Sequence, residues 1–246
     1  MREIRTFVRA GSSARGFSLI ELLLVILIIA VLISLLAPSL KQVKDRAERV
    51  AAFSRFAGLG KGFIAYTADF KDTWPYLTDP NATWTILRAP HIDMGVEYWD
   101  IYCWWHVPLS ELVYKLPWTD VSFRQNRREL PGPTPFWYSS AFLADPRFFV
   151  PSSRVGRNQW RATRVDEVLF PSRKALLVNG GAWDDGKKSS SPLPMVFADA
   201  SAAEVPSNAT LGWNPNGTGS WDPGGGFFAP IAGMTTLEGV RGRDRQ

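Results

Sequence analysis

A single carboxylate, Glu21, lies inside an apolar run from Phe17 to Ala37, and no other residue of that run is charged. A charged side chain at the centre of a bilayer costs about 2.5 kcal/mol or more, so an acid at this position needs a physical reason. Pairing with a cation would offset the desolvation of both charges. The alternative is a carboxylate that extends to the membrane interface without a partner. Glu21 is therefore the first candidate functional residue.

Three aspartates, Asp184, Asp185 and Asp199, are candidate calcium ligands, because carboxylate oxygens suit this cation. Calcium needs about six to eight oxygen ligands, and the spacing matches no fixed calcium loop, so a solvated acidic turn is favoured. The two histidines, His91 and His106, occur without any Cys-x-x-Cys pair, which argues against a zinc site. We therefore expect no metal site and no cofactor.

The sequence also lacks the common signatures of catalysis. No Gly-x-Ser-x-Gly, His-Glu-x-x-His or phosphate-binding Gly-x-x-x-x-Gly-Lys occurs, and the glycines at 224–226 are not followed by lysine. The one cysteine, Cys103, cannot form an intramolecular disulfide and is expected to be a small buried residue. We therefore expect that the chain is not an enzyme.

All 11 tryptophans follow residue 70. Flat indole rings can stack on sugars, which makes a carbohydrate-binding head the alternative function. The adjacent Trp104 and Trp105 would point to opposite faces of a strand, so only one of them could join such a platform. Packing of the tryptophans in a hydrophobic core is therefore favoured.

The apolar run that carries Glu21 is long enough to form a membrane helix, because about 20 helical residues cross the roughly 30 Å hydrocarbon core. Four arginines and one glutamate precede it in residues 1–16, and positive flanks stay cytoplasmic. The chain after Leu40 should then lie across the membrane. A secretory signal peptide would have a shorter apolar core, and a plain single-pass anchor would leave Glu21 unexplained. A run of this length also argues against the core helix of a soluble protein.

The segment Gly16-Phe17-Ser18-Leu19-Ile20-Glu21 resembles the cleavage and methylation motif of type IV prepilins, Gly-Phe-[Ser/Thr]-Leu-[Ile/Val]-Glu. In that family a membrane peptidase cuts after the glycine and methylates the new amino terminus. The resemblance implies that Gly16 is the processing residue and Phe17 the new terminus. Glu21 then takes the place of the glutamate at the fifth position of the mature chain, and Pro38 that of a proline toward the end of the run.

The resemblance gives these residues physical roles. Gly16 leaves an unhindered, flexible backbone at the scissile bond. Glu21 lies one helical turn from the new terminus, so its carboxylate can pair with an amino group of a neighbouring subunit and set the stacking register. Pro38 removes one helical hydrogen bond and permits local bending or melting on assembly. The apolar face of 17–38 would be the packing surface of a filament.

Residues 41–68 are expected to continue the helix as an amphipathic segment. A stripe of residues spaced by three or four predicts the face that packs on a head domain. Its members are Val43, Ala47, Val50, Phe53, Ala57, Gly60 and Ile64. Gly58, Gly60 and Gly62 each weaken a helix by about 1 kcal/mol relative to Ala, so the helix is expected to thin or end there. Residues 69–75 indicate an exit loop.

Two further segments are similar to a pseudopilin-like group with a His-x9-Asp-Gly signature. From Arg46 to Pro75 the matching positions are Leu59, Tyr66, Asp69 and Pro75, whereas Ser54 replaces the usual asparagine and a glycine near Asp72 is missing. The second segment, 195–205, is similar to a Phe-Ala-Asp-Gly-His-Val element. Here Ala200 replaces the turn glycine and Ser189 stands at the histidine position, so the carboxyl-terminal signature is degraded.

The expected fold class is α+β, with the long amino-terminal helix packed on a head that contains an antiparallel sheet. The domains expected are a leader (1–16), a membrane helix (17–40), the amphipathic continuation (41–68) and the head (69–246) with a flexible tail (206–246). Within the head we expect strand-like segments at 99–107 and 136–142, a short helix at 108–116, a turn and buried strand at 171–178, and a hairpin at 195–205.

The net charge of +5 gives no support for nucleic-acid binding, because residues 1–16 alone hold four arginines and one glutamate. We expect a structural subunit of a type IV pilus-like or type II secretion pseudopilus filament. Its partners would be the prepilin peptidase, other pilin or pseudopilin subunits through the amino-terminal helix, and the membrane. It would cross the bacterial inner membrane once, with a cytoplasmic amino terminus and a periplasmic head.

Overall fold

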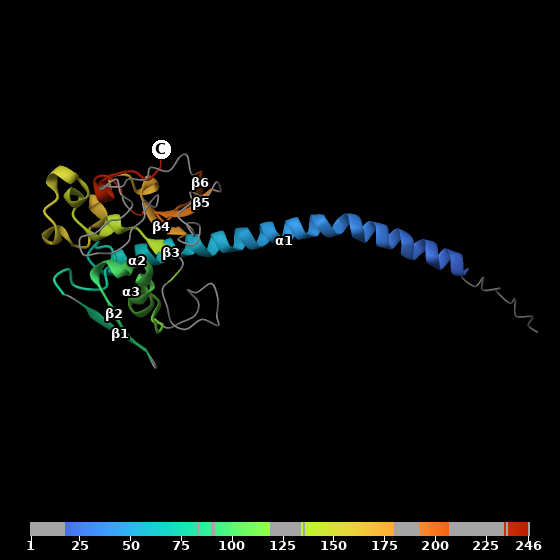
Figure 1. Cartoon of the computed structure of the whole chain (residues 1–246), viewed down its shortest axis with the longest axis horizontal. Helices are drawn as coiled ribbons and strands as arrows, with labels where there is room; N and C mark the ends of the chain where they lie inside the picture. Colours follow the sequence, from blue (N-terminus) through green and yellow to red (C-terminus); the bar gives the residue numbers. More distant parts are fainter. Residues whose placement is uncertain are drawn as a thin grey trace, which may run out of the picture. The chain divides into compact units, whose positions relative to one another are not determined.

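A computed structural model of the chain describes residues 18–82, 84–89, 92–118, 134, 136–179, 192–206, 234 and 236–245. Its contacts divide the chain into two compact units, Met1–Ala51 and Ala52–Gln246. One 51-residue helix, α1 (Leu19–Asp69), begins in the first unit and ends in the second (Figure 1). The long amino-terminal helix expected from the sequence is confirmed.

Antiparallel sheets in the second unit confirm the α+β class. The main sheet has the order β3-β4-β5-β6, and a separate hairpin pairs β1 with β2 (Figure 1). The strands are β1 (Thr85–Ala89), β2 (Ile92–Val96), β3 (Phe136–Tyr138), β4 (Ala175–Asn179), β5 (Leu193–Phe197) and β6 (Ala202–Val205). The buried strand after the Pro171 turn and the hairpin around Asp199 are therefore also confirmed.

Short helices fill the connections between the strands. They are η1 (Tyr98–Asp100), α2 (Ile101–Trp104), α3 (His106–Pro108), η2 (Leu109–Tyr114), η4 (Ser140–Leu143), η5 (Pro146–Phe149), η6 (Pro151–Ser153), η7 (Arg157–Gln159), η8 (Val165–Glu167), η9 (Pro171–Arg173) and η12 (Gly239–Arg241). The helix expected at 108–116 is confirmed by η2, and the strand expected at 136–142 is confirmed only as far as Tyr138.

The strand expected at 99–107 is wrong, because this segment is helical. Ile101, Trp105 and Leu109 are spaced by four and join the main core cluster, whereas Trp104 and Val107 join another cluster. Helical periodicity thus distributes two sets of apolar side chains between two cores. The aromatic composition suggested a strand, but the spacing of the apolar residues, aliphatic ones included, fits a helix better.

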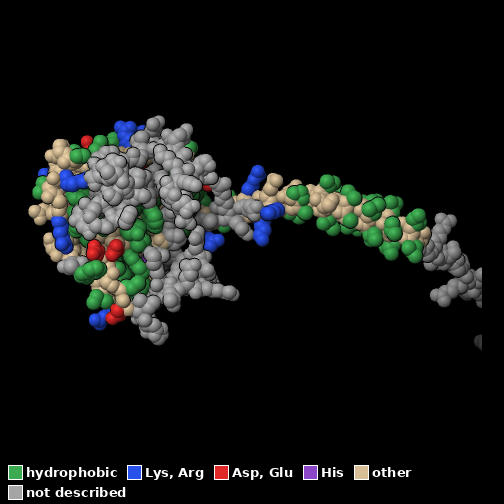
Figure 2. All heavy atoms as spheres, viewed as in Figure 1, with side chains coloured by type: hydrophobic (Ala, Val, Ile, Leu, Met, Phe, Trp, Pro, Cys, Tyr) green, Lys and Arg blue, Asp and Glu red, His purple; other side chains and the backbone are tan. Residues whose placement is uncertain are grey.

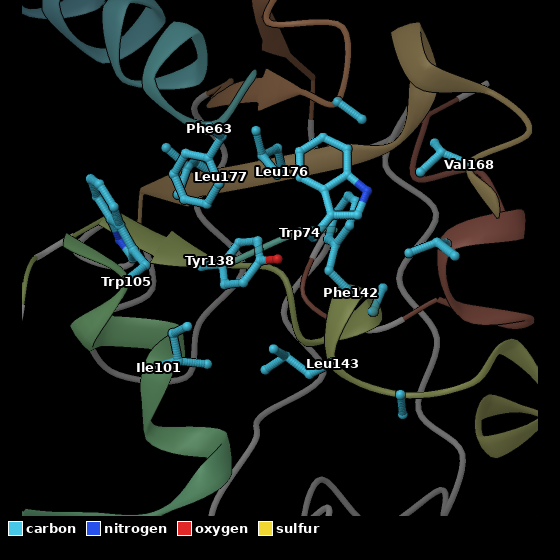
Figure 3. Packing of buried hydrophobic residues seen from close by; sticks show 14 of the residues in the cluster. Phe63, Trp74, Ile101, Trp105, Tyr138, Phe142, Leu143, Val168, Leu176 and Leu177 are labelled. Carbon is cyan, nitrogen blue, oxygen red and sulfur yellow. The ribbon is translucent and has the colours of Figure 1, made fainter. Parts of the chain in front are cut away.

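Aromatic side chains dominate the core of the second unit (Figure 3). Phe63 of α1 contacts Trp105 and Tyr138, with ring centroids 5.3 and 5.0 Å apart. Trp74 packs edge-on against Phe142 at 4.7 Å. The buried tryptophans are Trp74, Trp99, Trp104, Trp105 and Trp118, which confirms core packing for these five.

The face of α1 that enters this core differs from the predicted stripe. Phe56, Phe63 and Tyr66 are buried, whereas Val50 and Ile64 of the predicted stripe are exposed. Gly60 of the predicted stripe is buried and Phe53 and Ala57 are half-buried, so the prediction is confirmed for these positions. It is wrong for Val50 and Ile64, and it missed the large rings that enter the core.

Gly58, Gly60 and Gly62 do not end α1, which continues to Asp69. A Cβ atom on Gly60 would lie 2.5 Å from Cγ1 of Val196 in β5, and one on Gly62 would collide with the hydroxyl of Tyr114. Gly58 has open space around it. Two of the three glycines therefore let the helix approach its neighbours closely.

The different space around Gly60 and Gly58 predicts that the same substitution by alanine changes the stability in opposite directions at the two positions. Gly60→Ala should lower the free energy of unfolding by about 1–2 kcal/mol, because overpacking outweighs the gain in helix propensity. Gly58→Ala should raise it by up to about 1 kcal/mol. Urea denaturation of the full chain in detergent, followed by tryptophan fluorescence, measures both. Equal effects of the two substitutions would contradict the close approach at Gly60.

Two residues that follow α1 adopt a backbone conformation in which glycine is usually found. Lys71 and Asp72 adopt left-handed backbone conformations with φ of 54° and 59°. The Asp72 N–H donates to the Thr67 carbonyl at 2.9 Å, which closes the helix. The side chain of Trp74 then enters the core, and the backbone N–H of Trp74 donates to the Thr163 carbonyl at 2.9 Å. The expected exit loop is confirmed, with two non-glycine residues in the turn.

The flexible tail predicted for 206–246 is wrong for residues 236–245, which pack on the second unit. Val240 and Asp244 are fully buried, and the guanidinium of Arg245 lies 4.2 Å from the ring centroid of Phe197. Most of 206–233 lies outside the described residues. The polar composition of the last residues suggested a solvated tail, but Asp244 is paired with a buried lysine.

Candidate functional site

Ser18 and Glu21 form a reciprocal cap at the start of α1. The Ser18 N–H donates to Oε2 of Glu21 at 2.9 Å, and the Ile20 N–H donates to Oγ of Ser18 at 3.3 Å. This is the geometry of a capping box, in which a Ser-x-x-Glu sequence satisfies N–H groups left over at a helix start. Ser18 was not among the predicted functional residues, although its Ser-x-x-Glu spacing indicates a helix start.

The helix after this cap presents an apolar surface. One segment, Leu19–Lys44, is long and apolar enough to cross a membrane. Hydrophobic side chains surround this part of α1 (Figure 2), and the large ones between Leu19 and Leu40 are at least 43 % exposed. So large an apolar surface is unfavourable in water, and it is typical of a segment that anchors a protein in a membrane. Glu21 is the only charged residue within 19–40.

Pro38 lies inside α1, as expected from its place near the end of the apolar run. It has no N–H to offer the carbonyl of Ser34, so one helical hydrogen bond is missing at this level. The Ser34 hydroxyl donates to the Val31 carbonyl at 2.7 Å.

Several predicted site residues lie outside the described residues. These are Gly16, Phe17, His91, Asp184 and Asp185. The calcium candidate Asp199 lies in the turn between β5 and β6, where its Oδ1 accepts hydrogen bonds from the N–H and hydroxyl of Ser201 at 2.9 and 2.6 Å. The structure thus assigns Asp199 a local turn contact, and the calcium site suggested with Asp184 and Asp185 lies in part outside the described residues.

The remaining candidates in the head are packed side chains. Burial raises the pKa of the Cys103 thiol to about 12, so this cysteine is a poor nucleophile. His106 is buried and its ring stacks on Trp104, with centroids 5.7 Å apart. Trp84 is 59 % exposed, and it is the one exposed tryptophan in the described part of the chain. The described tryptophans therefore offer no paired platform for a sugar.

A charged network links three segments of the second unit. Arg161 forms a bidentate pair with Glu167, at 2.6 and 2.7 Å, and also contacts Asp145 at 3.3 Å. Arg147 donates to Asp145 through both its backbone and its side chain. Partial burial raises the pKa of Asp145, but the hydrogen bonds from Arg147 and Arg161 lower it more, to about 2. The hydrogen bonds from Arg161 lower the pKa of Glu167 as well.

These shifts predict a loss of head stability in acid. A carboxyl whose folded-state pKa is depressed contributes stability above its unfolded pKa and loses that contribution as pH falls toward the folded pKa. The free energy of unfolding should therefore be constant from about pH 7 to 5 and decline between the ordinary value of 3.8 and about 2. For Asp145 the loss should be about 1–2 kcal/mol, since the exposed Arg147 is screened by solvent.

Urea denaturation of the full chain at a series of pH values measures this loss. Asp145→Asn should be less stable than the wild type at pH 6 and should show a flatter decline in acid. The exposed pair of Arg164 and Asp166, 3.3 Å apart, offers a control, because Asp166→Asn should change the profile little. An unchanged profile in Asp145→Asn would contradict the assignment.

Comparison with protein families finds one match. A family model described as the prokaryotic N-terminal methylation motif matches residues 11–37. The match contains Gly16, Phe17 and Glu21, and it supports a type IV pilin-like or pseudopilin-like precursor, as the sequence indicated. Comparisons with curated proteins and with solved structures give no significant match.

Proposed function

We propose that this chain is a structural subunit of a type IV pilus-like or type II secretion pseudopilus filament. The observation that carries the proposal is the methylation motif at residues 11–37, which overlaps an exposed apolar helical segment whose one charge within 19–40 is Glu21. A motif of this kind, followed by a helical segment that is otherwise uncharged as far as residue 40, fits a precursor that is first processed and then packed against other helices. In this proposal the chain is a substrate and a building block, not a catalyst.

The proposed processing step cuts after Gly16 and methylates Phe17. The capping box supports this assignment, because α1 begins at Leu19 and the proposed scissile bond precedes the first helical residue. A peptidase needs an accessible backbone, and a bond inside a helix would first have to unwind. The arginine-rich residues 1–16 favour a cytoplasmic location for this step.

The proposed assembly step uses the surface that the described chain leaves uncovered. Neighbouring subunits would cover the apolar side chains of α1, and the carboxylate of Glu21 would pair with the amino group of Phe17 on an adjacent subunit. A subunit in the wrong register would leave this charge unpaired in an apolar setting, at a cost of about 2.5 kcal/mol or more. Pro38 would ease bending of the helix as it packs.

The chain would then be anchored in the bacterial inner membrane by a single span, with its head in the periplasm.

Membership of the His-x9-Asp-Gly group is a finer proposal. It is supported by the β5–β6 hairpin, where Ala200 has the left-handed φ of 61° that the turn glycine of that group would adopt. Lys71 and Asp72 have positive φ where a glycine of the pattern is missing.

Mass spectrometry of the amino terminus of the protein from its native membrane tests the proposal. The expected mature chain starts at methylated Phe17. Gly16→Leu should block cleavage, whereas Gly11→Leu, the same substitution five positions upstream in the leader, should leave it intact. A wild-type chain that retains residues 1–16, or one cut beyond Pro38, would overturn the proposed processing.

A further inference from the structure

Three polar side chains, those of Lys174, Thr236 and Asp244, all contact one another in the interior of the second unit. Lys174, immediately before β4, and Asp244, near the carboxyl end, both have fully buried side chains. Nζ of Lys174 lies 3.0 Å from Oδ2 of Asp244 and donates to Oγ1 of Thr236 at 2.5 Å. The Thr236 hydroxyl donates to Oδ1 of Asp244, and the Ala175 N–H donates to Oδ2 at 2.8 Å.

An ion pair explains why Lys174 and Asp244 can both be buried, but it does not require the additional hydrogen bonds from Thr236 and the Ala175 N–H. The amine nitrogen lies 3.0 Å from Oδ2, so it is held beside the carboxyl group that it would have to attack. One carboxyl oxygen, Oδ2, receives a backbone N–H, as the oxyanion of an acyl-transfer intermediate requires. The other, Oδ1, receives a hydroxyl that is also bonded to the amine, so a proton can pass from nitrogen to oxygen through Thr236.

We propose that Lys174 and Asp244 become joined by an intramolecular amide bond. Nζ attacks Cγ of Asp244, and the negative charge that develops on Oδ2 is stabilised by the Ala175 N–H. The Cγ–Oδ1 bond then breaks. Two of the three protons of the lysine ammonium leave with Oδ1 as one water molecule, relayed by the Thr236 hydroxyl, and the third stays on the amide nitrogen. No oxidant or other reactant is needed.

The surroundings of the pair favour this condensation. Burial lowers the pKa of Lys174, although the neighbouring Asp244 opposes this effect, and a neutral amine is the nucleophile that the step requires. Both side chains have no exposed surface, so bulk water has little access to the bond once it has formed. The low polarity of the site also favours the neutral products over the buried ion pair.

The bond would fasten the carboxyl-terminal segment to the sheet. It closes a loop that contains β4, β5 and β6, and a cross-link of this kind restricts the unfolded chain much as a disulfide does. The single cysteine leaves the chain without an internal disulfide, so the amide would be its one covalent clamp among the described residues. This inference is independent of the proposed role in a filament.

Mass spectrometry of the denatured full-length chain, purified in detergent, tests the proposal. The wild type should have the mass of its sequence less one water molecule, after correction for any amino-terminal processing measured on the same sample. A tryptic digest should contain a branched peptide in which Asp244 is attached to Lys174, and cleavage after Lys174 should be lost. A wild-type digest with free Lys174 and unmodified Asp244 would show an ion pair only and overturn the proposal.

Matched variants separate the roles of the three residues. Lys174→Arg keeps a positive charge but offers no nucleophilic amine, so it should have the full mass. Thr236→Ser keeps the hydroxyl and should be linked, whereas Thr236→Val should be linked at least tenfold more slowly. A Thr236→Val chain that is linked as fast as the wild type would overturn the relay. Because the wild-type mass alone decides whether the bond exists, a variant that fails to fold does not weaken the test.

Discussion

Glu21→Ala is expected to abolish recovery of the chain in filaments, while cleavage after Gly16 and retention in the membrane persist. The substitution makes the membrane helix more apolar, so anchoring should be at least as strong as in the wild type. In the proposed filament, assembly should fail because each variant subunit would leave a neighbouring amino group unpaired in an apolar environment, which would cost about 3–5 kcal/mol per contact. The measurement is the fraction of processed chain found in a sedimentable filament preparation.

Two further variants separate the ionic role of Glu21 from its role in the helix cap. Glu21→Gln keeps an oxygen that can accept the Ser18 N–H but loses the charge, so it should still fail to assemble. Ser34→Ala removes a neutral polar group from the same apolar segment and should assemble normally. Normal assembly of Glu21→Gln would show that Glu21 acts through the cap, and failure of Ser34→Ala would point to a general defect of the helix.

The amino-terminal region could be predicted from sequence because the information there is local. A run without charges other than Glu21 decides the length of the membrane segment, and the residues around Gly16 carry the motif. The β5–β6 hairpin was predictable for the same reason, since its two strands and its turn are adjacent in sequence. Ser18 could have been found by the same local reading.

The failures came from contacts between residues distant in sequence. The buried face of α1 depends on which row meets Trp105 and Tyr138, and neither partner can be inferred from the helix alone. The fixed position of residues 236–245 depends on Lys174, which follows a surface turn and gave no signal of burial. Arg161 likewise joins Asp145 to Glu167 across a stretch without regular periodicity. Such pairs are set by tertiary packing, which single-sequence patterns do not encode.

The second large effect is expected for Phe63→Ala, which should lower the free energy of unfolding of the head by about 3–5 kcal/mol. Phe63 is fully buried between Trp105 and Tyr138, so its removal leaves a cavity that rigid aromatic neighbours cannot fill (Figure 3). A domain is typically stable by about 5–15 kcal/mol, so this loss should make the head sensitive to protease. The measurement is urea denaturation of the full chain in detergent, for which the tryptophans report on the head alone.

Ile64→Ala is the matched control, because Ile64 is the next residue of α1 and is exposed. Its effect should stay within about 0.5 kcal/mol, as is usual for surface positions. The reverse order of effects would mean that the aliphatic row, and not the aromatic one, faces the core. The Phe63→Ala chain should still be cleaved after Gly16, because the capping box belongs to the first unit and Phe63 to the core of the second. Loss of cleavage in that variant would show that a folded head is required before the leader can be removed.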